Sequence, residues 1–376
     1  MYNKNWIDIF LAVSMCVFLL LCTELLFRFM YEPHDILDTR SPNFVHEISF
    51  DEQLGWSLIS NLNAPMYHYD NKNIIQRIHN NGHMRLSRNI TKLKPENTTR
   101  ILILGDSMIY GVGIDQKDTL PYNLQDILDH DSHKSSRRAY EVLTLATPSY
   151  GTDQEYLSYY FQGVEFNPDI VILGMFYNDF YENMMDFTAS RKPLFYLNYS
   201  TAGLMLANFP VKEFKKEKTR PKPHSALLNK ITTLKQNKQS FYNQTNRNYW
   251  LMFEAINHEG HQQGYAVMHK LLFTIKHRVE LNNATLIILY LPSQLELDTE
   301  IQQRFMNQYD DISATDLNFT KHHDMMFDIY TLLNISVIDF TDEMSSDPKK
   351  FFLKKDNHYS EIAQELIAQR TAEKIE

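Results

Sequence analysis

Cysteine is almost absent from this sequence. Only Cys16 and Cys22 occur in 376 residues, and both lie inside one apolar segment near the amino terminus. The rest of the chain therefore cannot form disulfides, thiolate zinc sites or a cysteine nucleophile. It must be held together by core packing, and 43% hydrophobic residues suffice for one large domain or two modest ones.

Other features that would indicate a function class are also missing. The net charge is −9 and the isoelectric point about 5.9, which argues against nucleic acid as the main partner. Gly111-x-Gly113 lacks the third glycine and the βαβ context of a phosphate-binding loop. The histidines within 258–261 and 322–324 do not fall at expected strand ends, and such clusters arise by chance among 15 histidines. We therefore expect no nucleic acid, no cofactor and no metal.

The longest apolar run, residues 7–27, is 21 residues long, and about 20 are enough to cross a bilayer. No cleavage site of small residues follows it, which favours an uncleaved signal anchor over a removed signal peptide. Lys4 and the terminal amine favour a cytoplasmic amino terminus, whereas Arg28 opposes it. We expect residues 1–30 to form a single transmembrane helix and the body of the protein to lie in the periplasm. A buried helix of a soluble protein is the alternative.

Strands and helices are expected to alternate from residue 100 onward. Residues 31–99 are mixed and polar, and we expect a tether and a small β-rich lead-in there. In the domain 100–376, the alternation predicts an α/β fold, a three-layer α/β/α sandwich with a mostly parallel sheet. The first expected strand begins at residue 100, and the others span 141–145, 169–173, 285–291 and 335–340. The expected helices span 119–128, 153–161, 264–281, 323–333 and 360–374.

A basic insertion at about 187–250 interrupts this alternation. Between residues 209 and 250 it holds ten Lys or Arg against two Glu, in a chain that is acidic as a whole. Such a segment could face anionic headgroups or an anionic polymer. A solvated, mobile loop is at least as consistent with this composition.

Gly105-Asp106-Ser107 follows a short strand without polar alternation, as expected for a strand buried on both faces. Ligands of open α/β sheets bind at the carboxyl ends of the strands. A serine on a tight turn at this position holds its hydroxyl clear of the sheet. The alternative is an ordinary strand-to-helix turn in which Ser107 caps the helix.

Three further loops carry polar groups that a serine nucleophile needs. Asp356 and His358 lie two residues apart before the last helix, a spacing that supplies a base and a carboxylate to orient it. Asn178 follows another expected strand and could donate to an oxyanion. The loop 146–153 follows a third and could offer a backbone N–H. Taken singly, each has an ordinary interpretation as a cap, a turn or a loop histidine.

Together, the order Ser, Gly, Asn, Asp-x-His resembles the SGNH (GDSL-like) hydrolase family from about residue 100 to the carboxyl terminus. The resemblance implies a flavodoxin-like fold with Ser107 as nucleophile and His358 as base. It implies that Asp356 orients the base, and that Ser107 N–H, Gly151 N–H and the Asn178 side chain form the oxyanion hole.

Two departures from the family pattern stand out. Phe176 occupies a position where the family usually has glycine, and the second block places Ser149 where its glycine is expected. Ser149 could serve if its φ is negative; we favour Gly151. Leu54-Gly55-Trp56 and the segment 80–85 resemble a signature of membrane-anchored envelope members.

These observations predict an acyl-ester hydrolase or O-acyltransferase that acts outside the cytoplasmic membrane through an acyl-enzyme on Ser107. The resemblance implies O-acetyl groups of cell-envelope glycans as substrate. A lipid esterase or lysophospholipase, and a catalytically inactive binding module of the same fold, are the alternatives. The sequence identifies no envelope protein partner.

Overall fold

The computed structural model describes residues 47–375 apart from residues 72, 81, 136–138, 199, 201–202, 214–252, 256–258 and 310; before residue 47 it describes only positions 12, 14, 15, 18 and 19. His46–Phe214 and Ser240–Glu376 form one compact unit, and Met1–Val45 with Lys215–Gln239 form another. The expected membrane segment and most of the basic insertion lie outside the described residues. Within the described part, no helix is long and apolar enough to cross a membrane.

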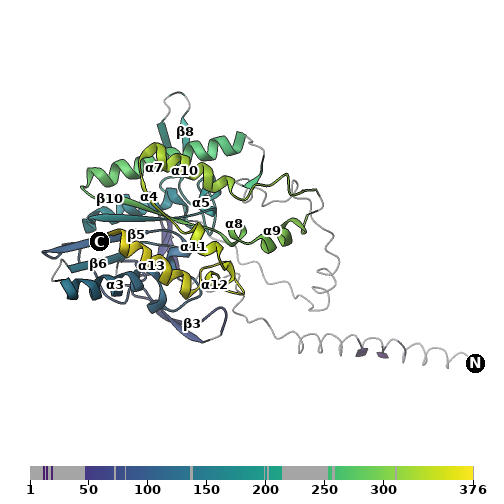
Figure 1. The fold of residues 1–376 in the computed structure, drawn as a ribbon, viewed down its shortest axis with the longest axis horizontal. Coiled ribbons are helices and arrows are strands. Elements are labelled where there is room, and N and C mark those ends of the chain that lie inside the picture. Colours follow the sequence, from purple (N-terminus) through teal and green to yellow (C-terminus); the bar gives the residue numbers. More distant parts are fainter. Residues whose placement is uncertain are drawn as a thin grey trace, which may run out of the picture. The chain divides into compact units, whose positions relative to one another are not determined.

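A parallel five-stranded sheet forms the centre of the larger unit (Figure 1). Its strand order is β11-β10-β7-β5-β6, and every neighbouring pair is parallel. Apolar runs make these strands because both faces of the sheet are covered. The predicted α/β fold with a mostly parallel sheet is confirmed. The strands are β5 (Thr98–Leu104), β6 (Ala139–Thr144), β7 (Ile170–Phe176), β10 (Thr285–Leu291) and β11 (Ser336–Asp339).

Helices cover both faces of the sheet, and alternate residues of β5 show how. Ile101 and Ile103 pack in a core with α3 (Leu120–Ser135) and α13 (Glu361–Ile375). Leu102 and Leu104 point to the other face. The core there includes residues of α4 (Thr152–Phe161), α7 (Glu259–Leu281) and α10 (Lys321–Leu333).

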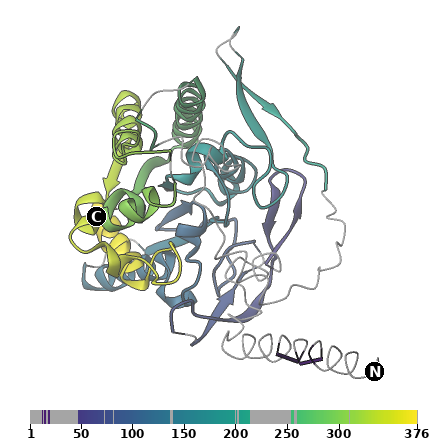
Figure 2. The same ribbon diagram turned by 90° about the vertical axis from the view of Figure 1, so that its right-hand side faces the viewer.

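In the part of the chain that the structure describes, three antiparallel hairpins lie outside the central sheet. Two lie in the lead-in: β1 (Ile48–Asp51) with β2 (Gly55–Leu58), and β3 (Asn63–Tyr67) with β4 (Ile74–Ile78). The third, β8 (Leu194–Asn198) with β9 (Gly203–Ala207), lies in the expected insertion and projects from the body in Figure 2.

Short helices fill the loops at the ends of the strands. They are α2 (Ser107–Tyr110), α5 (Asn178–Glu182), α8 (Gln294–Leu297), α9 (Thr299–Met306), α11 (Thr341–Ser345) and α12 (Pro348–Phe351), with 3₁₀ turns at Gln116–Asp118 and Gly163–Phe166.

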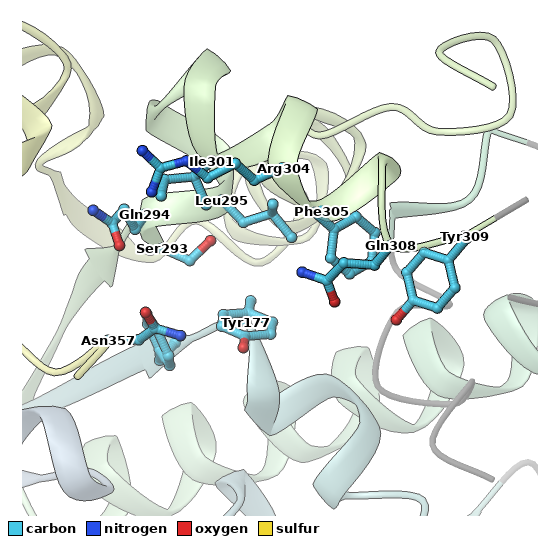
Figure 3. A pocket seen from close by; sticks show the side chains of 11 residues that line it. Tyr177, Ser293, Gln294, Leu295, Ile301, Arg304, Phe305, Gln308, Tyr309 and Asn357 are labelled. Atoms are coloured by element: carbon cyan, nitrogen blue, oxygen red, sulfur yellow. The ribbon is translucent and has the colours of Figure 1, made fainter. Parts of the chain in front are cut away.

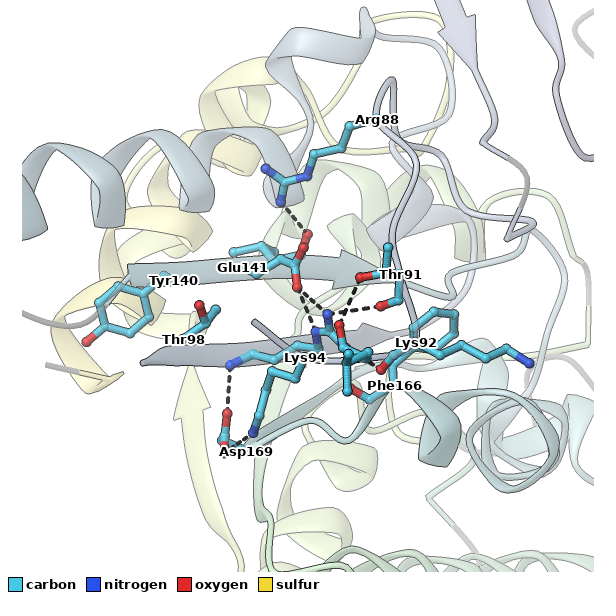
Figure 4. A network of polar contacts seen from close by, with 12 residues as sticks. Arg88, Thr91, Lys92, Lys94, Thr98, Tyr140, Glu141, Phe166 and Asp169 are labelled. Atoms are coloured by element: carbon cyan, nitrogen blue, oxygen red, sulfur yellow. Dashed lines mark hydrogen bonds and ion pairs between the residues drawn. The ribbon is translucent and has the colours of Figure 1, made fainter. Parts of the chain in front are cut away.

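Arg100, the third residue of β5, fixes the amino-terminal edge of the sheet. Figure 4 labels its partners Glu141, Thr91, Phe166 and Asp169. Its guanidinium is fully buried and donates to Glu141 Oε2 at 2.7 Å and to the carbonyls of Thr91 and Phe166 at 3.0 and 2.5 Å. Its backbone N–H donates to Asp169 Oδ2 at 2.7 Å. A buried cation is tolerated only when its donors are satisfied, as they are here. The network ties β5, β6, β7 and the lead-in together at the end opposite the candidate site.

Candidate active site

Ser107 lies at the carboxyl end of β5 as the first residue of α2, and it is half-buried. The helix cap is Asp106, whose side chain accepts the N–H of Met108 at 2.8 Å. The alternative in which Ser107 caps the helix is therefore wrong, and its hydroxyl is not used in this way. Gly105 is required by close packing, because a Cβ there would lie 2.3 Å from Ile109 Cγ1.

Asn178 begins α5 directly after β7, the strand beside β5. Parallel strands end at the same edge of a sheet, so the residues after β5 and β7 meet. The Asn178 Nδ2 donates to Asp106 Oδ2 at 3.1 Å, and this bond holds the amide beside the start of α2. Burial raises the pKa of Asp106, although hydrogen bonds from Met108 and Asn178 oppose the rise.

Asp356 and His358 are joined in the loop between α12 and α13. Asp356 Oδ1 contacts His358 Nδ1 and also accepts the His358 backbone N–H at 3.0 Å. Burial alone would raise the pKa of Asp356. The hydrogen bonds that this carboxylate accepts and the charge of His358 together outweigh burial, so the pKa of Asp356 is lowered. The carboxylate is therefore an acceptor, and Nδ1 is the donor. In the neutral imidazole with its proton on Nδ1, Nε2 carries the lone pair that a general base requires.

The loop of His358 lies at the same edge of the sheet as Asn178, because the ring of the next residue, Tyr359, lies 6.4 Å from the ring of Phe176 at the end of β7. Among the described residues no hydrogen bond joins Ser107 and His358. Gln364 of α13 donates from Nε2 to the carbonyl of Met108 at 2.7 Å, which ties the two segments together. Catalytic hydrogen bonds are often long in unliganded sites and shorten when substrate binds.

The loop 146–151 lies against the nucleophile turn, since Thr147 N–H donates to Gly105 O at 3.0 Å. Ser149 has a φ of +64°, so the negative φ that its use as oxyanion donor requires is not present. Gly151 has a φ of −96° and caps α4. Its role as second oxyanion donor stays a prediction.

A group of buried carboxyls lies behind the site. Burial and mutual repulsion raise the pKa of Glu155, Asp179 and Glu182 well above the usual range, which favours their neutral forms. Lys192 and Asn178 oppose this rise at Glu182. Lys192 is fully buried and contacts Asp153 in α4. In the described part of the chain, no group of three or more His, Cys, Asp or Glu side chains is arranged to hold a metal ion.

Sequence reasoning missed the residues of the lead-in that support the site. Arg85 is buried and donates to the carbonyls of Tyr110, Gly111 and Ile114 at 2.7, 2.5 and 2.8 Å, which satisfies the carboxyl end of α2. Arg85 stands in the segment 80–85 that resembles a family signature, but no local pattern shows that its guanidinium binds these carbonyls.

Trp56 and Asp70 support two other loops of the site. Trp56 Nε1 donates to Pro148 O at 3.2 Å, in the loop that leads to Gly151. Asp70 accepts the N–H groups of Lys354 and Lys355 at 3.0 and 3.2 Å, in the loop that carries the base. Each contact joins residues far apart in sequence.

A pocket of about 300 Å³ adjoins the base loop (Figure 3). Asn357, which stands between Asp356 and His358, lines it together with Tyr177, which precedes Asn178. The segment 293–309, which includes α8 and α9, forms the facing wall. A capping box between Ser293 and Glu296 fixes α8.

No protein-family model and no curated protein matches the chain. Among solved structures, it is similar to TesA, with 10% identity and a TM-score of 0.41 over 74% of this chain and 98% of that one. A lipase/acylhydrolase from Enterococcus faecalis has 13% identity and a TM-score of 0.39 over 74% and 95% of the two chains. The acetyl xylan esterase AlAXEase has 10% identity and a TM-score of 0.40 over 74% and 100%. The function is therefore argued from the site itself.

Proposed function

We propose that this protein is a serine-dependent acyl-ester hydrolase or O-acyltransferase of the SGNH type. One observation carries the proposal: Ser107, Asn178 and the Asp356–His358 pair come together at one edge of the sheet. The Asn178–Asp106 hydrogen bond of 3.1 Å and the contact between the rings of Phe176 and Tyr359, with centroids 6.4 Å apart, support this arrangement. A nucleophile, an oriented base and an oxyanion donor are the parts that acyl transfer needs.

The reaction starts when Ser107 Oγ attacks the ester carbonyl while His358 Nε2 takes the hydroxyl proton. The oxyanion is stabilised by the N–H of Ser107, the N–H of Gly151 and the amide of Asn178. The carbon–oxygen bond to the alcohol then breaks, and His358 returns the proton to the leaving oxygen. Water or a sugar hydroxyl next attacks the acyl-enzyme, giving up its proton through His358 and freeing Ser107.

The place of action and the substrate belong to this proposal. The apolar run 7–27 supports a single membrane anchor with the catalytic domain in the periplasm. O-acetyl groups of cell-envelope glycans are the substrate that this location and the family resemblance favour. A lipid esterase or lysophospholipase is the second candidate, because an anchor keeps the site close to the bilayer and the insertion is basic.

A fluorophosphonate probe tests the chemistry, because it labels only an activated serine. The full-length protein in detergent micelles should be labelled, and Ser107→Ala and His358→Ala should abolish labelling while circular dichroism shows both variants folded. If folded wild-type protein neither reacts with the probe nor hydrolyses model esters, the inactive binding module is the correct interpretation.

A further inference from the structure

The pocket beside the base loop is positioned to hold one particular half of an ester. Asn357 lines it and is the neighbour in sequence of both Asp356 and His358. In serine ester chemistry the imidazole gives its proton to the leaving alcohol oxygen, so the alcohol half must lie on the imidazole side. A cavity that includes the base loop in its wall is therefore an alcohol site.

The polar lining of this pocket fits a neutral ligand with hydroxyl groups. Gln294 of α8, Gln308 just after α9 and Asn357 of the base loop bring three carboxamides to it; Gln294 is half-buried and the other two residues are exposed. A carboxamide offers donors and acceptors together, as a hydroxyl group does, and so pairs with hydroxyls in either direction. Among the described residues that line the pocket, the only charged side chain is Arg304, which is already paired with Glu300.

Apolar side chains supply the rest of the wall. Phe176 and Phe305 are buried, and Tyr177 is half-buried beside them. Flat rings suit the C–H faces of a sugar, whose hydroxyls project around its edge. The volume of about 300 Å³ lies at the lower end of the range for ligand pockets and fits one ring better than an extended oligosaccharide.

We infer that this pocket binds the alcohol half of the substrate and selects a single sugar ring. The inference rests on the proposed ester chemistry at Ser107 and adds the residues that recognise the substrate. Gln294 and Gln308 are specificity residues that bind sugar hydroxyls, while Tyr177 and Phe305 contact the ring faces. A cyclohexylmethyl alcohol forms no hydrogen bonds with the three carboxamides, whereas a sugar alcohol gains them.

Two acetyl esters of similar size test the inference on the full-length protein in detergent micelles. Methyl 6-O-acetyl-β-D-glucopyranoside carries ring hydroxyls, and cyclohexylmethyl acetate carries none. The galactoside and N-acetylglucosaminide analogues extend the first class. At least one sugar ester should exceed cyclohexylmethyl acetate by about tenfold or more in kcat/KM.

Variants then separate recognition from chemistry. Gln294→Leu and Gln308→Leu should each lower kcat/KM for the preferred sugar ester by roughly three- to tenfold, mainly through KM, because each removes a hydrogen bond made to substrate. In each variant the ratio of kcat/KM for the sugar ester to kcat/KM for cyclohexylmethyl acetate should therefore fall, and circular dichroism should show that the protein is folded. Gln303→Leu is the matched control, since Gln303 lies on α9, is exposed and does not line the pocket. It should change none of these quantities.

The outcomes distinguish this inference from the proposed function. If Ser107 is labelled but all esters react equally, or if the cyclohexylmethyl ester reacts faster, the sugar pocket is wrong and the ester chemistry stands. The sugar pocket is equally wrong if Gln294→Leu and Gln308→Leu behave like Gln303→Leu. If the folded protein is neither labelled nor active on any ester, both the chemistry and the pocket assignment are overturned.

Discussion

The side-chain amide of Asn178 donates a 3.1 Å hydrogen bond to Asp106, the residue that precedes the proposed nucleophile. Asp106 at the same time accepts the N–H of Met108 and caps α2. One buried carboxyl therefore fixes both the turn that carries Ser107 and the amide expected to face the oxyanion. The geometry of the proposed oxyanion hole then depends on Asp106, a residue that need not contact substrate.

Removing the Asn178 donor should slow acyl transfer without unfolding the protein. Asn178→Ala is expected to lower kcat for 4-nitrophenyl acetate by about 10²–10³-fold with little change in KM, because an oxyanion donor acts mainly in the transition state. Asn178→Asp keeps the shape, loses the donor and adds a negative charge, so it should be at least as slow. Equal kcat values for wild type and Asn178→Ala would remove Asn178 from the hole.

Asp356→Asn tests the orientation of the base. The carboxylate accepts from His358 Nδ1, and an amide in its place can donate to that nitrogen and so favour the wrong tautomer. We expect kcat to fall by roughly 10⁴-fold. Urea unfolding should show a loss of about 1–2 kcal/mol, because one oxygen, Asp356 Oδ1, makes both contacts and an amide turned to donate to Nδ1 no longer accepts the His358 backbone N–H. A variant of near-normal activity contradicts the assigned pair.

Arg85 is predicted to be a stability residue of the nucleophile helix. Arg85→Met leaves three buried carbonyls without their donors and should cost about 2–4 kcal/mol, measured by urea unfolding. Arg85→Lys keeps the charge, but a single ammonium does not reproduce the guanidinium fork, so it should restore only part of the loss. Arg370→Met, in an exposed ion pair on α13, is the control and should leave the midpoint nearly unchanged.

Glu155 should make the protein less stable as pH rises. Burial and neighbouring carboxyls raise its pKa well above the usual value. The folded state then holds a proton that the unfolded chain loses near pH 4.3, so this stabilisation is full below about pH 4.3 and falls as pH rises toward the native pKa.

Glu155→Gln removes this dependence. Melting temperatures measured from about pH 5 to 8 should therefore favour Glu155→Gln over wild type by a margin that grows with pH. Glu365→Gln, a substitution of an exposed glutamate on α13, should track wild type throughout. A constant difference between Glu155→Gln and wild type would show that Glu155 is already ionised in the folded state throughout this range, against the raised pKa.

The regular elements of the fold were predictable because their patterns are local. The expected strand 285–291 matches β10, and the expected helix 153–161 differs from α4 by one residue. Uninterrupted apolar runs indicate buried parallel strands whatever lies around them. The hairpin of β8 and β9 was missed because the basic residues that follow it dominated the composition of 187–250.

The site was predictable in part, for a different reason. Ser107, Asn178, Asp356 and His358 each follow or precede a recognisable element, so their loops could be assigned to one edge of the sheet. The pocket was not predictable, since its wall joins residues 176–177, 293–309 and 357, and only packing brings them together. The bond from Trp56 to Pro148 spans 92 residues and likewise leaves no local pattern.

The contact of Asp70 with Lys354 and Lys355 spans 284 and 285 residues. The loop of the proposed base is therefore held in part from the lead-in, not from the central sheet alone. A chain shortened to residues 98–376 would contain every strand of the central sheet and still lack these two hydrogen bonds.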